Sequence, residues 1–319
     1  MKPITKPGIN RQKKSGLLLL LPAAMLAIFS GCSKPAPENK NSNDSINHFN
    51  DTILSMEENP KLITYRTFVN QLDSSDVNSV SKAVEEYKTV FANERTGLCD
   101  TAFVVFQQFL DTLELQLNHR LQEDTTDYSP LLKGSKVSVK IKNFQQQLLQ
   151  NGFRIIGVDE MFYIQQYRPY VVQQIGYMLS DTLKLYLNEI DTENREGFSQ
   201  NGAITISPQQ LVDRTLWYEN FMKANPDFVF ISNCRAYKKA YLTYLFSGYG
   251  TTKFYSDAGK SALSPYFTEA YNYLFGTYPQ SEVTSLIQPY FDAIRQGQHQ
   301  LVRDIKKKYV IRGLIFNLE

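Results

Sequence analysis

The longest run of apolar residues at helical spacing lies between Asp159 and Ile190. A helix starting at Pro169 would place them on one stripe and would be about 22 residues, or about 33 Å, long. Because such a stripe must be buried, we predict a central core helix here, with the segment from Asp159 to Tyr167 as a separate short helix or a kinked start. The stripe comprises Val171, Val172, Ile175, Met178, Leu179, Leu183, Tyr186, Leu187 and Ile190.

Helix-capping side chains stand directly before proline at four places. A serine or asparagine accepts hydrogen bonds from the free amides that begin a helix, and proline suits its first position. Gln210 also stands where it would complete a capping box. Each pair predicts the start of a helix, and the pairs are Asn59-Pro60, Ser207-Pro208, Asn225-Pro226 and Ser264-Pro265.

Other helical patterns run over residues 75–93, 99–121, 280–296 and 298–311. Only residues 136–141, 153–158 and 203–206 have strand character, and regions 122–136 and 191–206 have the composition of loops. We therefore predict an all-α, predominantly helical fold with at most a small β-hairpin. The predicted buried face of the 99–121 helix comprises Phe103, Phe106, Phe109, Leu110, Leu113 and Leu117.

One internal similarity bears on the architecture. Residues 240–249 resemble residues 270–278, and both segments are aromatic and contain a glycine near their end. A repeat of about thirty residues is typical of stacked helical hairpins. Two copies leave open an irregular all-α domain as the alternative.

The chain begins with a basic segment without acidic residues, followed by an apolar run from Leu17 to Phe29. The run is too short to span a bilayer and is typical of an export signal. It ends at Phe29-Ser30-Gly31-Cys32, which resembles the lipobox of bacterial lipoprotein precursors. The resemblance implies cleavage before Cys32, a diacylglycerol on that cysteine and an acylated amino terminus. An ordinary secretory signal and a simple membrane anchor are the alternatives.

The residues after Cys32 bear on the location of the mature chain. Ser33 stands where a retaining aspartate occurs in well-studied Gram-negative lipoproteins, which implies the outer membrane. Lys34 and Pro35 replace the acidic cluster that some bacteria use for surface export, so we favour the periplasmic face over the cell surface. The membrane is thus the first expected partner, reached through the lipid.

Composition divides the chain into three parts. Residues 33–45 contain no large apolar side chain, so burial cannot offset their ordering entropy. We predict a signal peptide over 1–31, a lipidated flexible tether over 32–45 and a helical domain over 46–319. A sub-boundary near 191–206 is the alternative to one undivided domain.

Charge argues against nucleic acid as a partner. The precursor has 34 basic and 32 acidic residues, and removal of the signal takes five basic residues, which leaves 29. The mature chain then carries a net charge of −3 by this count. A nucleic-acid-binding domain would need a basic surface.

Cys99 and Cys234 remain once Cys32 is assigned to the lipid. In an oxidising compartment they could pair, and closing so long a loop would stabilise the fold by up to about 5 kcal/mol. The alternative is two separate buried thiols, which behave as small apolar residues.

A tyrosine-rich region is the candidate recognition surface. Tyrosine combines a flat apolar face with a polar tip, which suits sugars and protein partners alike. Helical spacing also allows these rings to belong to the core. The candidate residues are Tyr241, Tyr244, Tyr249, Tyr255, Tyr271 and Tyr273.

No motif points to catalysis, a metal or a cofactor. His48, His119 and His299 lie far apart and form no metal-binding pattern. A glycosidase needs two carboxylates on either side of its substrate, and Asp159 and Glu160 are the first to consider. Neighbours on a helix point about 100° apart, however, so capping of a helix explains these two better. We assign no catalytic residue.

These observations favour a lipid-anchored binding or scaffold protein of the cell envelope that presents an aromatic helical surface to an envelope protein or glycan. The alternative is an envelope lipoprotein that binds or cleaves glycans. A cleft with two facing carboxylates about 5–10 Å apart would favour the cleaving enzyme.

Overall fold

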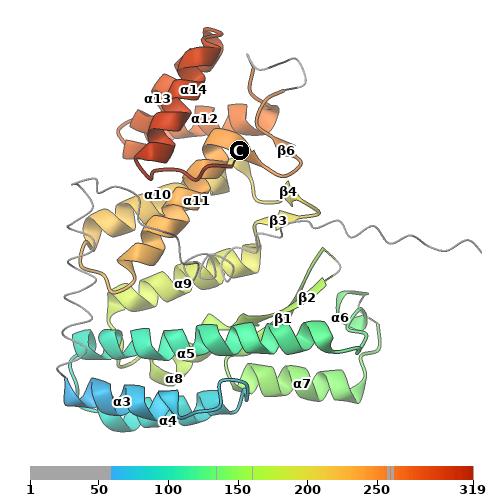
Figure 1. The fold of residues 1–319 in the computed structure, drawn as a ribbon, viewed down its shortest axis with the longest axis vertical. Coiled ribbons are helices and arrows are strands. Elements are labelled where there is room, and N and C mark those ends of the chain that lie inside the picture. The colour runs from blue at the N-terminus through green and yellow to red at the C-terminus, as the bar shows by residue number, and fades with distance from the viewer. Residues whose placement is uncertain (1–58, 134, 160, 257–258, 260–261, 319) are drawn as a thin grey trace, which may run out of the picture. The chain divides into compact units, whose positions relative to one another are not determined.

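The computed structural model describes residues 59–133, 135–159, 161–256, 259 and 262–318 (Figure 1). The predicted signal peptide, the lipobox-like segment with Cys32 and the predicted tether lie outside the described residues. Helices dominate the described part, as predicted, and three antiparallel two-stranded hairpins accompany them there. No helix in this part is long and apolar enough to cross a membrane.

The first half of the fold packs around one long helix, α5. Helices α3 and α4 contact α5, strand β2 contacts it as well, and strand β1 pairs with β2 and contacts α7 (Figure 1). In chain order the elements are α3 (Pro60–Asn70), α4 (Ser79–Phe91), α5 (Thr96–Glu123), α6 (Pro130–Lys133), α7 (Val139–Gln150), β1 (Phe153–Val158), β2 (Met161–Gln166) and α8 (Arg168–Ile175).

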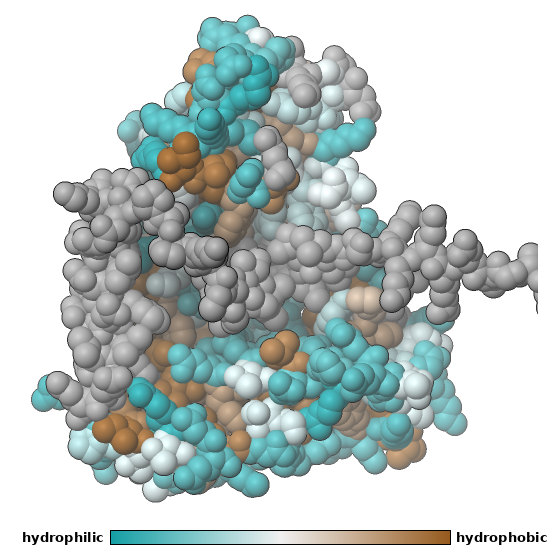
Figure 2. All heavy atoms as spheres, viewed as in Figure 1, coloured by the Kyte–Doolittle hydropathy of each residue, from teal (hydrophilic) through white to brown (hydrophobic). Residues whose placement is uncertain are grey.

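The second half packs around α10, which contacts α11, α12 and α13, while α13 contacts α14. Figure 2 shows hydrophilic residues over the end of the view where α13 and α14 lie, and α14 buries only Val302 and Tyr309. The elements are α9 (Asp181–Glu196), β3 (Ser199–Gln200), β4 (Ala203–Ile204), α10 (Pro208–Ala224), α11 (Ile231–Ser247), β5 (Gly248–Tyr249), β6 (Thr252–Lys253), α12 (Pro265–Thr277), α13 (Glu282–Arg295) and α14 (His299–Ile311).

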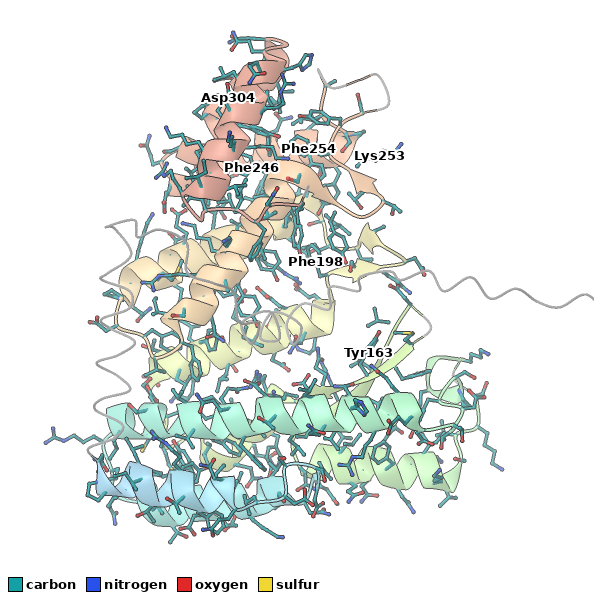
Figure 3. The ribbon with its side chains drawn as sticks, in the orientation of Figure 1. Tyr163, Phe198, Phe246, Lys253, Phe254 and Asp304 are labelled. Carbon is teal, nitrogen blue, oxygen red and sulfur yellow. The ribbon has the colours of Figure 1, made fainter. Side chains whose placement is uncertain are left out.

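Aromatic side chains fill both halves. All six residues of the predicted face of α5 are buried, and Phe103 meets Phe230 edge-on at 5.9 Å between ring centroids. In the second half, Phe246 lies 4.7 Å and Phe254 lies 5.9 Å from the ring of Tyr290 (Figure 3). Each buried ring stabilises the fold by about 1.5–3 kcal/mol, so these rings hold helices from distant parts of the sequence together.

The predicted core helix is two helices, α8 and α9. They separate because Ser180 caps α9, with its hydroxyl accepting a hydrogen bond from the amide of Leu183. All members of the apolar stripe except Val172 are buried, so the stripe was a correct guide to burial. Both helices face the same core, and the periodicity therefore continues across the break.

The short helix predicted before Pro169 is wrong. Its residues form the turn and strand β2 of the β1–β2 hairpin. Asp159 adopts a left-handed conformation with φ 51° in that turn, so it caps no helix. Aspartate tolerates this conformation better than most residues because its short side chain bonds locally. Glu160 lies outside the described residues.

Three of the four predicted helix starts are correct, although the side chain of Ser264 makes no capping hydrogen bond within the described residues. Asn59, Ser207 and Ser264 directly precede α3, α10 and α12, and Ser207 forms the expected capping box with Gln210. Asn225 instead follows α10, and its backbone amide donates to the carbonyl of Phe221. An asparagine before proline suits the end of a helix as well, because proline cannot continue it.

The strand predictions were partly right. Residues 153–158 form β1, and Ala203–Ile204 form β4, but residues 139–141 begin α7 after the cap Ser138. The similar segments around Tyr241 and Tyr271 lie in α11 and α12, and both helices pack against α10. The two segments therefore occupy helices that share one partner, and the choice between a helical repeat and an irregular all-α domain stays a prediction.

One side chain joins α5 to the free edge of β2. The side-chain amide nitrogen of Asn118 donates to the carbonyl of Ile164 at 2.7 Å. Its side-chain oxygen accepts from the backbone amide of Ile164 at 2.8 Å. Asn118 thereby supplies both bonds that a neighbouring strand would make. The hairpin is therefore fixed to the helix at one register.

We expect Asn118→Ala to lower the free energy of unfolding by about 1–3 kcal/mol, because both backbone groups of Ile164 lose their partner. Gln116→Ala, an exposed position on the same helix, should change it by less than about 0.5 kcal/mol. Urea unfolding of both variants measures the difference. Equal effects at the two positions would contradict the role given to Asn118.

Candidate functional site

A stripe of polar residues, spaced by four, three and four positions, follows the face of α5 that contacts β2. We call it the polar seam; it comprises Gln107, Asp111, Glu114 and Asn118, with Gln166 and Arg168 opposite. Buried polar groups need partners, and every member of the seam has at least one, although the Nε of Arg168 has no hydrogen-bond partner among the described residues. The sequence prediction followed the apolar face of this helix and missed the seam, although its spacing was visible.

Gln166 at the end of β2 connects the seam. Its amide nitrogen donates to Asp111 at 2.8 Å and to Glu114 at 2.7 Å, and its amide oxygen accepts from Gln107 at 3.0 Å. Arg168 donates to the amide oxygen of Gln107. Burial raises the pKa of Glu114 to about 7, although Gln166 and Arg168 oppose that shift. Burial raises the pKa of Asp111 as well.

A second buried carboxylate, Glu193, lies on α9. It accepts a hydrogen bond from the hydroxyl of Tyr241 at 2.7 Å, and burial raises its pKa to about 7 against the attraction of Arg214. Arg214 itself bonds Glu196 at 2.8 Å and the carbonyl of Gly197 at 3.0 Å. This cluster holds α9, α10 and α11 together.

The tyrosines predicted as a recognition surface are mostly core residues. Tyr241 and Tyr271 are 2% and 0% exposed, and Tyr244 is buried too. Tyr249, Tyr255 and Tyr273 are half-buried. Tyr241 stacks on Tyr218 of α10, and Tyr273 donates its hydroxyl to Asp213 of the same helix. Tyr271 donates its hydroxyl to the carbonyl of Leu245 in α11, so the six do not form one exposed face.

Cys99 and Cys234 are both free, buried thiols. The disulfide considered from the sequence is therefore not formed, and the alternative of two small apolar residues holds. No group of three or more acidic, cysteine or histidine side chains within the described ranges is arranged to hold a metal ion.

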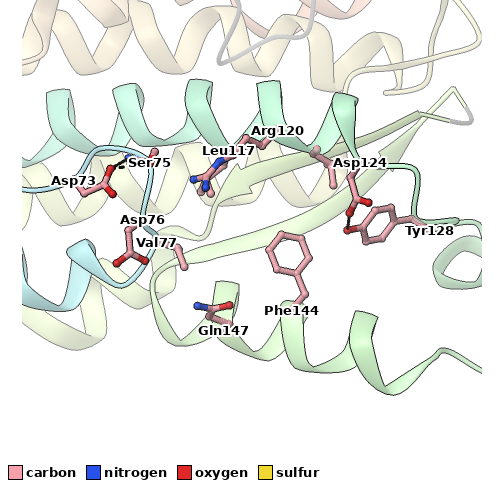
Figure 4. Close-up of a pocket in the computed structure, with 11 residues that line it drawn as sticks. Asp73, Ser75, Asp76, Val77, Leu117, Arg120, Asp124, Tyr128, Phe144 and Gln147 are labelled. Atoms are coloured by element: carbon pink, nitrogen blue, oxygen red, sulfur yellow. Dashed lines mark hydrogen bonds between the residues drawn. The ribbon is translucent and has the colours of Figure 1, made fainter.

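A pocket of about 370 Å³ lies between α5, α7 and the loop that joins α3 to α4 (Figure 4). This volume falls in the range of small-molecule sites. We call it the α5–α7 pocket. Its lining comprises Asp73, Ser75, Asp76, Val77, Leu117, Arg120, Leu121, Asp124, Tyr128, Phe144 and Gln147.

The rim of the pocket is acidic and ionised. Hydrogen bonds from the hydroxyl and backbone amide of Ser75 lower the pKa of Asp73. Bonds from Thr126 and from the hydroxyl of Tyr128 lower the pKa of Asp124 in the same way. Both carboxylates are therefore charged at neutral and mildly acidic pH. The sequence prediction included Leu117 as a buried residue but did not identify the pocket, because its lining comes from three distant segments.

Two of the buried glutamates, Glu114 and Glu193, predict a pH dependence of stability. Their pKa is about 7 in the folded protein and 4.5 in a free glutamate, so the unfolded chain binds fewer protons between these values. Each contributes stability that is complete below about pH 4.5 and is lost as the pH rises through about 7. We expect each to account for about 3 kcal/mol of that loss.

Unfolding in urea at several pH values checks this expectation. Glu114→Gln with Glu193→Gln should flatten the slope, because both glutamines keep the acceptor oxygen and remove the titration. A residual slope should remain from Asp100, Asp111 and Glu189, whose pKa values burial also raises. Glu123→Gln, at an exposed position of α5, should leave the slope unchanged. Stability that does not fall between about pH 4.5 and 7 in the unaltered protein would contradict the assignment.

No protein-family model, curated protein or solved structure matches this chain.

Proposed function

We propose that the chain is a lipid-anchored binding protein of the bacterial cell envelope, with the α5–α7 pocket as its recognition site. The observation that carries the proposal is the pocket itself, in which an ionised rim stands above an apolar and aromatic floor. The lipobox-like sequence at Phe29-Ser30-Gly31-Cys32 supports anchoring. Because the tyrosines predicted as a surface are largely core, the pocket replaces them in this proposal.

The chemistry of the rim favours binding over cleavage. A glycosidase needs a carboxylic acid that is still protonated at its working pH, which requires a raised pKa. Asp73 and Asp124 have lowered pKa values, so they are poor proton donors. The glutamates with a raised pKa, Glu114, Glu189 and Glu193, do not line the pocket.

A glycan ligand is the second candidate. Tyr128 and Phe144 offer aromatic faces, and Gln147 and Arg120 offer hydrogen-bond donors, which suits recognition of a sugar. In either case two or three acyl chains on Cys32 would hold the domain at the membrane, while residues 33–45 let it reach a partner. Such tethering raises the local concentration of the pocket.

We expect Cys32→Ser to abolish incorporation of a labelled fatty acid and to release the chain from the envelope fraction. Ser33→Asp should keep the label and move the chain from the outer to the inner membrane, whereas Ser33→Ala should do neither. Cell fractionation after labelling measures all three. Labelling that survives Cys32→Ser would contradict the lipoprotein assignment.

Recognition through the pocket can be tested by cross-linking in cells. A photoreactive amino acid at position 147, which lines the pocket, should give a discrete cross-linked product. The same amino acid at Gln146, an exposed neighbour on α7 outside the pocket, is the matched control. A product from position 147 that a glycan hydrolase removes would favour the sugar candidate. The absence of any product, or equal products at both positions, would overturn the pocket as the recognition site.

A further inference from the structure

The pocket has an unbalanced charge. Asp73, Asp76 and Asp124 line it with a single cationic side chain, that of Arg120. Attraction to Arg120 also lowers the pKa of Asp73. Two negative charges remain uncompensated by other members of the lining. Because the net charge of this lining is negative, a cationic ligand is attracted here more than a neutral one.

Asp73 and Asp76 keep carboxylate oxygen atoms for a ligand, whereas both oxygens of Asp124 accept bonds from Thr126 and Tyr128. The side-chain hydrogen bonds of Asp73 and Asp76 within the described residues end on Oδ1, which accepts from Ser75 and Asn78, respectively. These bonds hold each carboxylate in one orientation. Figure 4 shows both at one end of the pocket and Asp124 at the other, where its Oδ2 accepts from Tyr128. The rim is thus pre-organised rather than assembled by the ligand.

The floor between these ends is apolar. Val77, Leu117, Leu121 and Tyr128 are buried, and the half-exposed ring of Phe144 forms the wall on α7. An alkyl chain on this floor would bury apolar surface, and an ammonium or guanidinium group next to Phe144 would be attracted by the face of its ring. The lining therefore fits a ligand with an apolar stem and a cationic end.

We propose that the α5–α7 pocket binds a protonated alkyl amine or guanidinium, as in a lysine or arginine side chain of a partner segment. The inference rests on the proposed binding function and names the chemistry of its ligand. The cationic end pairs with the carboxylates of Asp73 and Asp76, and the stem lies on Leu117, Leu121 and Phe144.

Ligand-observed NMR with the lipidated chain in detergent tests the proposal. The probes are Nα-acetyl-lysine methylamide, which keeps its ε-ammonium group, and its norleucine analogue, which has the stem without the ammonium group. We expect the lysine probe to bind about tenfold more tightly or better, and increasing salt to weaken it. Butylamine as a second probe distinguishes a free amine from a side chain presented on a peptide backbone.

Isosteric variants identify the groups involved. Asp73→Asn with Asp76→Asn should weaken the lysine probe about tenfold, and both asparagines keep the oxygen that accepts the local bonds. Asp127→Asn removes one negative charge from a neighbouring aspartate outside the pocket and should have no effect. Arg120→Gln should strengthen binding, because it removes the one opposing charge. A misfolded variant could not produce that gain.

Equal binding of the lysine and norleucine probes, or weakening by Arg120→Gln, would overturn the proposal. Binding of an N-acetylglucosamine oligomer without binding of the lysine probe would overturn it in favour of a sugar. The proposed binding function has its own readout, the cross-link from position 147. A cross-link that persists when all amine probes fail would leave that function standing and reject only the ligand class.

Discussion

The fold depends on hydrogen bonds that compensate for the hydration lost by carboxylates on the inner face of the long helix α5. Asp111 and Glu114 lose water when α5 packs, and burial raises the pKa of both. Gln166 offsets part of that cost with its two amide bonds. A slip of β2 by one residue would turn Gln166 to the other side of the strand, where Gln165 instead accepts from Arg154 at 2.7 Å. The seam therefore selects one register of the hairpin.

That register in turn positions the pocket. Asn118 fixes β2 to α5 one position from Leu117, and Arg120 and Leu121 follow on the next turn. The ring of Tyr128, in the loop that follows α5, packs 5.8 Å from the ring of Phe162 of β2 and 6.4 Å from the ring of Phe144 of α7. The same interactions that satisfy the buried polar groups thus hold the walls of the pocket at fixed positions, which a recognition site requires.

The many tyrosines serve a different purpose from the one their number suggests. Tyr271, Tyr290 and Tyr309 donate their hydroxyls to the backbone carbonyls of Leu245, Phe246 and Leu286, and their rings are buried. The Leu245 and Phe246 carbonyls lie in the last turn of α11, which leaves such groups without helical partners. The rings fill the core while the hydroxyls complete helix ends. An aromatic region of this kind stabilises the interior and leaves recognition to other residues.

The sequence by itself determined the helical class, three helix starts and the buried face of α5, because caps and periodicity act within a few residues. Phe103, Phe106 and Leu110 show their burial through spacing alone. Spacing does not tell which partner a buried residue meets. The prediction therefore ran one helix through the break at Ser180, and it did not identify the polar seam. Only the tertiary structure brought Asp73, Arg120 and Phe144 to one pocket. Only in the folded protein do carboxylates that are equivalent in the sequence acquire different pKa values, with the pKa of Asp73 lowered and the pKa of Glu114 raised by burial. Desolvation and long-range packing arise from the folded arrangement and have no local signature in the chain.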